Sequence, residues 1–134
     1  MTIEMIDPPR LPQVPLYRQV SVATGSRLVH VAGQVGWDAD GATASLDLAD
    51  QVEQAYVNVA AALEGVGGSW DDVVDLTVFV VDWRPERMPE LVDGMERAFA
   101  RLGKRFVPPG TMIGVATLDV PEHLVELKVT AVLE

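Results

Sequence analysis

The feature that most constrains the fold of this chain is the run Leu124-Val-Glu-Leu-Lys-Val-Thr-Ala-Val-Leu133. Every second residue from Val125 to Leu133 is apolar, while Glu126, Lys128 and Thr130 alternate with them. Because successive side chains of a β-strand point to opposite faces of a sheet, this period of two predicts a strand with one face in the core. The Glu126 carboxylate must then point to the opposite face.

A Pro-Pro-Gly turn precedes this strand, in the segment Phe106-Val-Pro-Pro-Gly-Thr-Met-Ile-Gly-Val-Ala-Thr-Leu. Proline has no N–H to give to a regular ladder, so we expect the turn to close the preceding helix and to begin another β-rich run. The loop Asp119-Val-Pro-Glu-His would separate the two runs. We expect a functional site in this region.

The rest of the chain predicts the element order β-β-α-β-α-β-β. Residues 1–13 hold three prolines and no periodicity, so we expect an irregular arm there, followed by a single domain over residues 14–134. Two strands that meet at Gly25-Ser26, within residues 14–35, should pair as a hairpin. Helices are predicted from Asp47, as N-cap, to about Leu63, and from about Pro85 to Leu102.

The stretch Val73–Val81 is apolar on both faces, which is typical of a strand covered on both sides. Two helices can cover only one face of a single sheet, so the sequence predicts an α+β fold with one mixed sheet. The other face must then meet another subunit. We therefore expect several copies of the chain to assemble around the uncovered face.

Composition excludes several classes of function. The chain has no cysteine, so a disulfide, a thiolate metal site and a cysteine nucleophile are ruled out. A net charge of −10 disfavours nucleic-acid partners, which need Lys and Arg to displace counterions. The acidic amino terminus has no signal-peptide pattern and no apolar run has membrane-spanning length, so we expect a cytoplasmic protein that does not enter a membrane. No motif for a metal or a cofactor is found.

Residues 108–116 and the triplet Val125-Glu126-Leu127 resemble the carboxyl-terminal signature of the RidA/YjgF family of reactive-intermediate deaminases. The motif Val31-Ala-Gly-Gln-Val resembles a second signature of that family. The similarity extends over about residues 14–133. It implies a chorismate-mutase-like α+β fold, a homotrimer, and small-molecule sites in the clefts between neighbouring subunits.

Transferred one residue at a time, the resemblance implies a site built from several segments. The family's tyrosine falls on Tyr17, and its water-activating glutamate falls on Glu126. At four further positions the resemblance implies a site residue that is changed here: Ala32 replaces a serine, Asp93 an asparagine, Gly110 an arginine and Met112 a cysteine. The resemblance also places Thr111 and the backbone N–H of Gly33 at the site.

The missing arginine matters most, because in the deaminases it holds the carboxylate of a 2-imino acid. Removing one partner of such a charge-assisted pair costs about 2–5 kcal/mol. A site with Gly110 in that place, and with Asp93 as an added carboxylate, should repel a 2-imino acid. Alternatives remain for individual residues: Glu126 as a solvated or interface-paired acid, Tyr17 as an ordinary strand aromatic, and Asp93 as a surface acid.

Three functions are compatible with these residues. The first is an enzyme in which Glu126 is general acid and base toward a reactive imine, enamine or related small metabolite. The second is a trimer that binds a metabolite without turnover. The third, a ribonuclease or inhibitor of translation, is the least favoured because of the negative charge and the lack of a basic aromatic surface.

Overall fold

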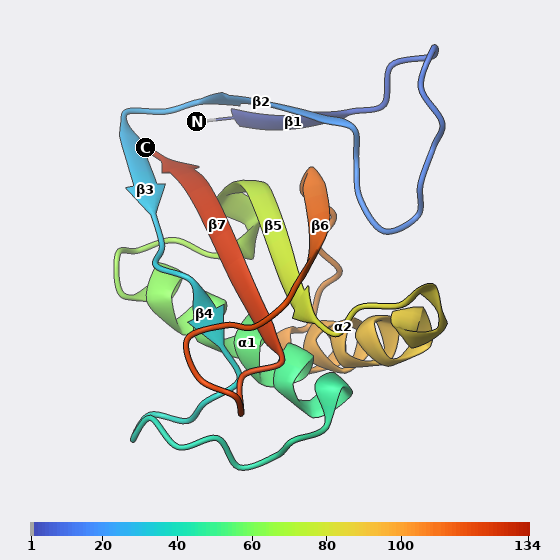
Figure 1. Cartoon of the computed structure of the whole chain (residues 1–134). Helices are drawn as coiled ribbons and strands as arrows, with labels where there is room; N and C mark the ends of the chain where they lie inside the picture. Colours follow the sequence, from blue (N-terminus) through green and yellow to red (C-terminus); the bar gives the residue numbers. More distant parts are fainter. Residues whose placement is uncertain (1) are drawn as a thin grey trace.

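The computed structural model describes residues 2–134 and has a mixed main sheet with two helices on one face (Figure 1). The strands of this sheet lie in the order β3 (Arg27–His30), β7 (Val125–Leu133), β5 (Val73–Val81) and β6 (Gly110–Val115). The short strand β4 (Gln34–Val35) pairs with β7 farther along its length. Only β5 and β6 are parallel to each other, so the sheet is mixed, as expected.

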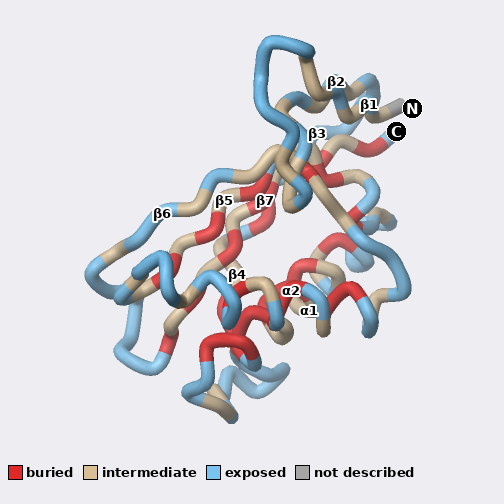
Figure 2. The backbone as a smooth tube through the Cα atoms, turned by 90° about the vertical axis from the view of Figure 1, so that its right-hand side faces the viewer, coloured by how far each residue is buried: buried red, intermediate tan, exposed pale blue. Residues whose placement is uncertain are grey.

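Strand β7 lies in the middle of the sheet and confirms the alternation predicted for it. Val125, Leu127, Val129, Ala131 and Leu133 are at most 3% exposed and face the helices. The intervening residues from Glu126 to Val132 are half-buried on the other face. The buried parts of β5, β7 and both helices meet in one layer between sheet and helices (Figure 2).

Helices α1 (Leu48–Glu64) and α2 (Met88–Leu102) confirm the two helical predictions. The Asp47 side chain accepts a hydrogen bond from the N–H of Asp50 and so caps the start of α1. The predicted apolar stripe of α1, from Leu48 to Leu63, is buried. A 3-10 turn, Pro85–Arg87, precedes α2, and a second, Trp70–Asp72, leads into β5.

Gly94 allows the two helices to approach closely. A Cβ atom at this position would lie 2.5 Å from the carbonyl oxygen of Ala49 and 2.6 Å from Cβ of Val52. The glycine therefore weakens α2 as an isolated helix but permits its backbone to rest directly on α1. This contact supplies the tertiary packing that a glycine in mid-helix requires.

The amino-terminal segment is not wholly irregular, so the prediction for residues 1–13 is wrong in part. Strand β1 (Thr2–Ile6) pairs with β2 (Val20–Thr24) in a separate antiparallel ribbon at one end of the main sheet (Figure 1). The Asp7 carboxylate closes the intervening loop, because it accepts hydrogen bonds from the Gln19 N–H and from Arg18. These bonds also hold the pKa of Asp7 below its usual range.

The hairpin predicted within residues 14–35 does not form. At Gly25 the chain crosses the end of β7, where a Cβ atom would lie 2.6 Å from the Leu133 carbonyl oxygen, and Ser26 donates its N–H to that same oxygen. Strand β3 then pairs with β7, while β2 pairs with β1. The expected second strand is also interrupted at residues 31–33, between β3 and β4.

The Pro-Pro-Gly turn starts a strand, as predicted, but it does not end the helix. Helix α2 ends at Gly103, whose left-handed backbone (φ 80°) lets its N–H reach the Phe99 carbonyl. Five residues later, Pro108 is buried and the Pro109 carbonyl accepts the N–H of Leu76. Pro109 therefore helps to join the start of β6 to β5 through its carbonyl group.

We expect Gly94→Ala to lower the free energy of unfolding by about 1–3 kcal/mol, although alanine favours helix, because the methyl group overlaps α1. Urea denaturation followed by circular dichroism measures this loss. Gly65→Ala is the control. Gly65 has a right-handed helical backbone (φ −61°), and a Cβ atom added there would lie no closer than 3.3 Å to a neighbouring atom. A stabilising effect of Gly94→Ala would show that the helices do not need this close contact.

Candidate functional site

Glu126 and Gly33 form the first part of the candidate site. Glu126 lies in β7 on the face of the sheet that the helices leave uncovered. A Cβ atom on Gly33 would lie 2.6 Å from Cδ of Glu126 and closer still to its Oε1. The glycine thus leaves room for the carboxylate to rest against the backbone. The fold brings these two predicted site residues together.

Glu126 differs from the other half-buried acids of the chain. Within residues 2–134 the half-buried acidic residues are Asp7, Glu53, Asp72 and Glu126. Asp7 binds Arg18, Glu53 binds Arg101, and Asp72 belongs to the capping box of the 3-10 turn. Among the described residues, the Glu126 carboxylate has neither an ion-pair partner nor a hydrogen-bond donor. Its oxygens therefore remain available to a ligand or to a second chain.

The surface around Glu126 is largely apolar. Its neighbour across the ladder in β5 is Phe79, which in turn is level with Ile113 in β6. Ile113 is 41% exposed. Lys128, two residues along β7, donates a hydrogen bond from its ammonium group to the Val31 carbonyl oxygen. The carboxylate thus stands beside apolar side chains.

The second part of the candidate site is a pocket at the open edge of the sheet. It is lined by residues of α1, α2 and β5 together with Tyr17, Gly110, Thr111 and Met112. Gly110 leads into β6, and a Cβ atom there would lie 3.9 Å from Cβ of Tyr17. The backbone of Gly110 is not left-handed, since the only positive-φ glycines in the described residues are Gly41, Gly67 and Gly103.

The two parts are too far apart to form one small-molecule site within a single chain. Gly110 is level with Leu76, and hence with Val129, whereas Glu126 lies three positions farther along β7. Three residues span roughly 10 Å along a strand, and the two steps from β6 to β7 add about 10 Å across the sheet. The backbones of Gly110 and Glu126 are therefore about 14 Å apart.

Of the two remaining predicted site residues, Asp93 lies away from both parts and Ala32 is adjacent to Gly33. Asp93 is on the outer side of α2, where its carboxylate accepts a 2.6 Å bond from Arg97, and its side chain is 56% exposed. Arg97 also binds Asp50 of α1, so Asp93 belongs to an ion-pair network between the helices. Ala32 is exposed next to Gly33, and its carbonyl accepts a bond from the Gln34 side chain.

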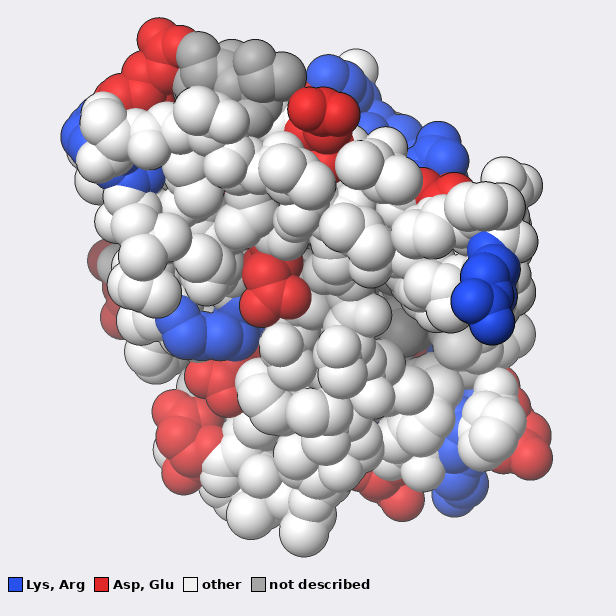
Figure 3. Space-filling model, turned by 90° about the horizontal axis from the view of Figure 1, so that it is seen from above, with Lys and Arg blue, Asp and Glu red and all other residues white. Residues whose placement is uncertain are grey.

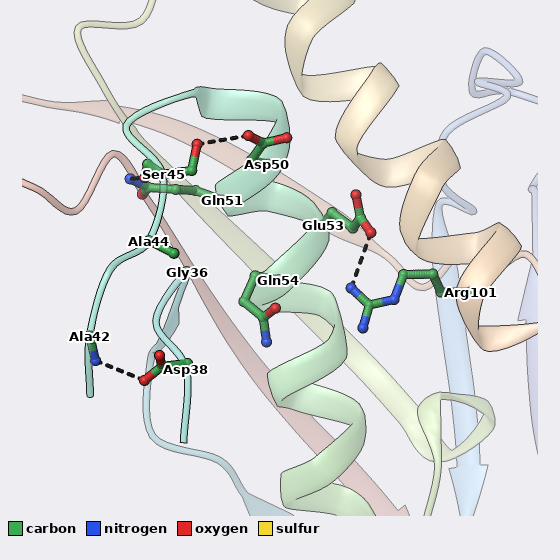
Figure 4. A pocket seen from close by; sticks show the side chains of 10 residues that line it. All are labelled: Gly36, Asp38, Ala42, Ala44, Ser45, Asp50, Gln51, Glu53, Gln54 and Arg101. Atoms are coloured by element: carbon green, nitrogen blue, oxygen red, sulfur yellow. Dashed lines mark hydrogen bonds and ion pairs between the residues drawn. The ribbon is translucent and has the colours of Figure 1, made fainter. Parts of the chain in front are cut away.

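A third, polar hollow lies between α1 and the loop after β4 (Figure 4). Its charged groups are already engaged: Glu53 with Arg101 at 3.1 Å, Asp50 with the Ser45 hydroxyl, and Asp38 with the N–H of Ala42. The Ser45 hydroxyl, with Arg97, also keeps the pKa of Asp50 below its usual value. These bonds hold the loop against α1 and account for the polar groups there.

The basic residues near the end of α2 are paired as well. Arg97, Arg101, Lys104 and Arg105 each bind an acid, the last two binding Asp71 and Glu96. On the face seen in Figure 3, lysine and arginine side chains form separate groups with uncharged and acidic side chains between them. The acids that pair with the four cations near the end of α2 make this part of the described surface unfavourable for a phosphate backbone.

His123 is buried, at 3% exposed, in the loop before β7, where its Nδ1 lies 2.5 Å from Asp119 and its ring meets Trp37 edge-on. The bond to His123 lowers the pKa of Asp119.

No group of three or more potential metal ligands occurs within residues 2–134. No helix in this range has the length and hydropathy needed to cross a bilayer.

Sequence reasoning missed Tyr56. It is 2% exposed, lines the same pocket as Tyr17, and stacks on Trp70 with ring centroids 4.8 Å apart. In the sequence it is simply one member of the apolar stripe of α1. Nothing in the helical periodicity indicates that its hydroxyl reaches a pocket, because that depends on how β5, β6 and α2 pack over it.

Comparisons with known proteins agree with this fold. The family model described as Endoribonuclease L-PSP matches residues 10–133. The RutC family protein YjgH of Escherichia coli is 36% identical over 66 residues, and the matched part is 49% of this chain and 50% of that protein. The match thus spans about half the length of this curated relative.

Solved structures extend the similarity over nearly the whole chain. The Rid-family protein YyfB from Yersinia pestis, described as of unknown function, has a TM-score of 0.86 at 30% identity, covering 99% of this chain and all of that one. A YjgF-family protein from Mycobacterium tuberculosis has a TM-score of 0.62 at 26% identity, covering 98% and 100%. The structure of YjgH has a TM-score of 0.65 at 30% identity, covering 88% and 85%.

We expect Gly33→Ala to lower the free energy of unfolding by about 1–3 kcal/mol, because the new methyl group overlaps the Glu126 side chain. In a Glu126→Ala background the loss should fall to less than half, since the obstructing side chain is gone. A double-mutant cycle measured by urea denaturation gives this coupling. Gly110→Ala, with no atom nearer than 3.7 Å to its Cβ, is the matched control; additive effects of Gly33→Ala and Glu126→Ala would contradict the contact.

Proposed function

This chain belongs to the family described as Endoribonuclease L-PSP, and from that premise we propose that it acts on a reactive imine, enamine or related small metabolite. Glu126 is the general acid and base. Hydrolysis of an imine adds one water across the C=N bond and then releases the amine and the carbonyl compound. A carboxylate can take the proton from the attacking water and return it to the departing nitrogen.

The observation that carries this proposal is the unpaired Glu126 carboxylate. It is held near the start of β7 against Gly33, partly shielded from solvent, with no partner among the described residues. A purely structural acid in such a position would be expected to have a hydrogen bond or an ion pair, as Asp7, Glu53 and Asp72 do. A carboxylate that transfers protons must be free to bind the substrate and partly shielded from solvent, and Glu126 meets both conditions.

A complete site needs more than one copy of the chain. Glu126 and Gly33 lie about 14 Å from the Tyr17 and Gly110 pocket within one chain, so they can share a small ligand only if a neighbouring copy brings its own pocket edge to Glu126. The uncovered face around Phe79 and Ile113 gives such a neighbour an apolar surface to cover. We propose a homotrimer with three such clefts.

A standard 2-imino acid is a poor substrate for this arrangement. Gly110 offers no cation, and the two arginines that could replace it are already paired: Arg18 with Asp7, and Arg105 with Glu96. A substrate carboxylate would meet the Glu126 carboxylate, and the Lys128 ammonium two residues along β7 is already bound to the Val31 carbonyl oxygen, which disfavours binding. A neutral imine or enamine avoids this repulsion.

Binding without turnover is the second candidate function, and it uses the same residues. It differs in what Glu126 does, because a carboxylate that only binds can be replaced by an amide at modest loss of affinity. Ribonuclease activity is disfavoured by the net charge of −10 and by the pairing of the basic side chains near the end of α2.

We expect light scattering at micromolar concentration to give three times the chain mass of 14.5 kDa. Ile113→Asp should shift the mass toward the monomer, because it places a charge in the apolar surface that a neighbour would cover. Val66→Asp is the control. Val66 is similarly exposed, at 44%, but it lies in the turn after α1 and not on the uncovered face of the sheet. A stable wild-type monomer would rule out the shared cleft.

We expect the protein to accelerate hydrolysis of the neutral imine N-benzylidenemethylamine, followed by the absorbance of benzaldehyde, more than hydrolysis of 2-iminopropanoate. Glu126→Gln should lower the catalysed rate by about 10²–10⁴-fold, because the amide cannot carry the proton. Glu64→Gln, an exposed acid at the end of α1, is the control. An unchanged rate in Glu126→Gln would favour binding alone, and faster hydrolysis of 2-iminopropanoate would contradict the role of Gly110.

A further inference from the structure

The pocket at the edge of the sheet has no charged side chain in its lining. Its lining includes Leu76 and Val78 of β5, Leu91 and Met95 of α2, and Tyr56 of α1. Four other pockets in the described residues each contain at least one Asp, Lys or Arg. In a chain with 20 acidic and 10 basic residues, this lining favours a neutral ligand.

The size of the pocket fits a single ring. It holds about 130 Å³. An engineered cavity of about 150 Å³ lined by apolar side chains stays dry and binds benzene. Tyr17 and Gly110 also line the pocket, and the lack of a side chain on Gly110 leaves space beside Tyr17.

Tyr56 adds a polar group to this apolar space. Its hydroxyl has no hydrogen-bond partner among the described residues, and burial is the only cause that raises the pKa of its phenol. Every fully enclosed side-chain nitrogen or oxygen in the described residues does have a partner. The Tyr56 hydroxyl must therefore keep some contact with open space, and the open space that Tyr56 lines is this pocket.

A buried hydroxyl without a partner costs free energy, so native proteins rarely keep one without a reason. Phenylalanine would fill the same place, since the ring of Tyr56 already stacks on Trp70 and meets Phe99 edge-on. The hydroxyl is thus unnecessary for packing. It can donate one hydrogen bond to a molecule in the pocket.

We propose that this pocket binds a neutral, ring-sized apolar group that carries one hydrogen-bond acceptor, which the Tyr56 hydroxyl contacts. Binding of such a group would extend the proposed function, and it rests on that function in one respect, namely that the protein acts on small molecules. It names the chemical class of the substituent: an aromatic or cyclic group with a carbonyl or imine-type acceptor. A carboxylate is excluded, because the lining offers it no cation.

Fluorine NMR with three probes tests the proposal. On the full-length protein, we expect 3-fluoropyridine, neutral at pH 8 and with one acceptor, to bind with a dissociation constant of about 1 mM or below. Fluorobenzene should bind more weakly, and 3-fluorobenzoate should not bind. Tyr56→Phe should weaken 3-fluoropyridine by about two- to tenfold while leaving fluorobenzene unchanged, because a single neutral hydrogen bond is lost.

Two further variants separate the pocket from the chemistry at Glu126. Met88→Trp should abolish binding of both neutral probes, since Met88 lines the pocket and is 37% exposed, so a larger ring there can cover it. Val66→Trp, an exposed site outside the pocket, should not. Probe binding is measured without turnover, so a failure of the proposed catalysis and a failure of the pocket give different results.

Failure of both neutral probes to bind, or equal effects of Tyr56→Phe on the two, would overturn the proposal. Binding of 3-fluorobenzoate as tight as that of 3-fluoropyridine would overturn the restriction to neutral groups. Thermal unfolding provides a second check: Tyr56→Phe should not lower the melting temperature if the hydroxyl is unpartnered. A clear drop would show that the hydroxyl has a structural bond and would contradict its availability to a ligand.

Discussion

The rest of the structure depends on the position of β7 between β5 on one side and β3 and β4 on the other. Its five inward side chains, from Val125 to Leu133, pack against α1 and belong to the same buried cluster as the inner residues of α2. Removing any of these apolar groups from water contributes to stability in proportion to the area buried. The same alternation sends Glu126 to the uncovered face, so one strand fixes both the core and the candidate acid.

Glycines determine where parts of the chain can touch. Gly94 lets α2 rest on α1, and Gly33 lets the backbone lie against the Glu126 carboxylate. Gly110 acts differently: its Cβ would meet nothing closer than 3.7 Å, so the missing side chain leaves space in the lining of the edge pocket. The first two glycines are required by packing, whereas the third is open to change, and this is the position where the family resemblance implies an arginine.

The candidate site consists of two unlike environments. Glu126 is a lone carboxylate on an apolar sheet face, and the edge pocket is apolar with a single buried hydroxyl at Tyr56. The sheet geometry keeps them apart within one chain, because β6 and β7 are separated by β5 and the two positions are offset along the strands. A neighbouring copy would bring an acid next to a ring-sized pocket, which together suit a neutral, reactive ring-bearing metabolite.

Local patterns in the sequence determined most of the fold. The period of two in residues 124–133, the period of 3.6 after Asp47 and the apolar run at Val73–Val81 each describe a strand or helix that formed where predicted. These patterns depend on which side chains are apolar and how they are spaced, and the backbone geometry of one element is enough to interpret them. The family resemblance grouped Glu126 with Tyr17, Gly33 and Gly110 in one site; within one chain Glu126 lies against Gly33, and Gly110 lies near Tyr17.

Only the tertiary structure decided which strands pair and which site residues meet. Strand β2 pairs with β1 because Asp7 closes the loop back onto residues 18 and 19, and because the chain at Gly25 must cross the end of β7. Arg97 of α2 forms an ion pair with Asp50 of α1, and Tyr56 lines a pocket that four separate segments enclose. Such contacts join residues far apart in the chain, so no local pattern encodes them; they are fixed by which surfaces the packed sheet and helices leave open.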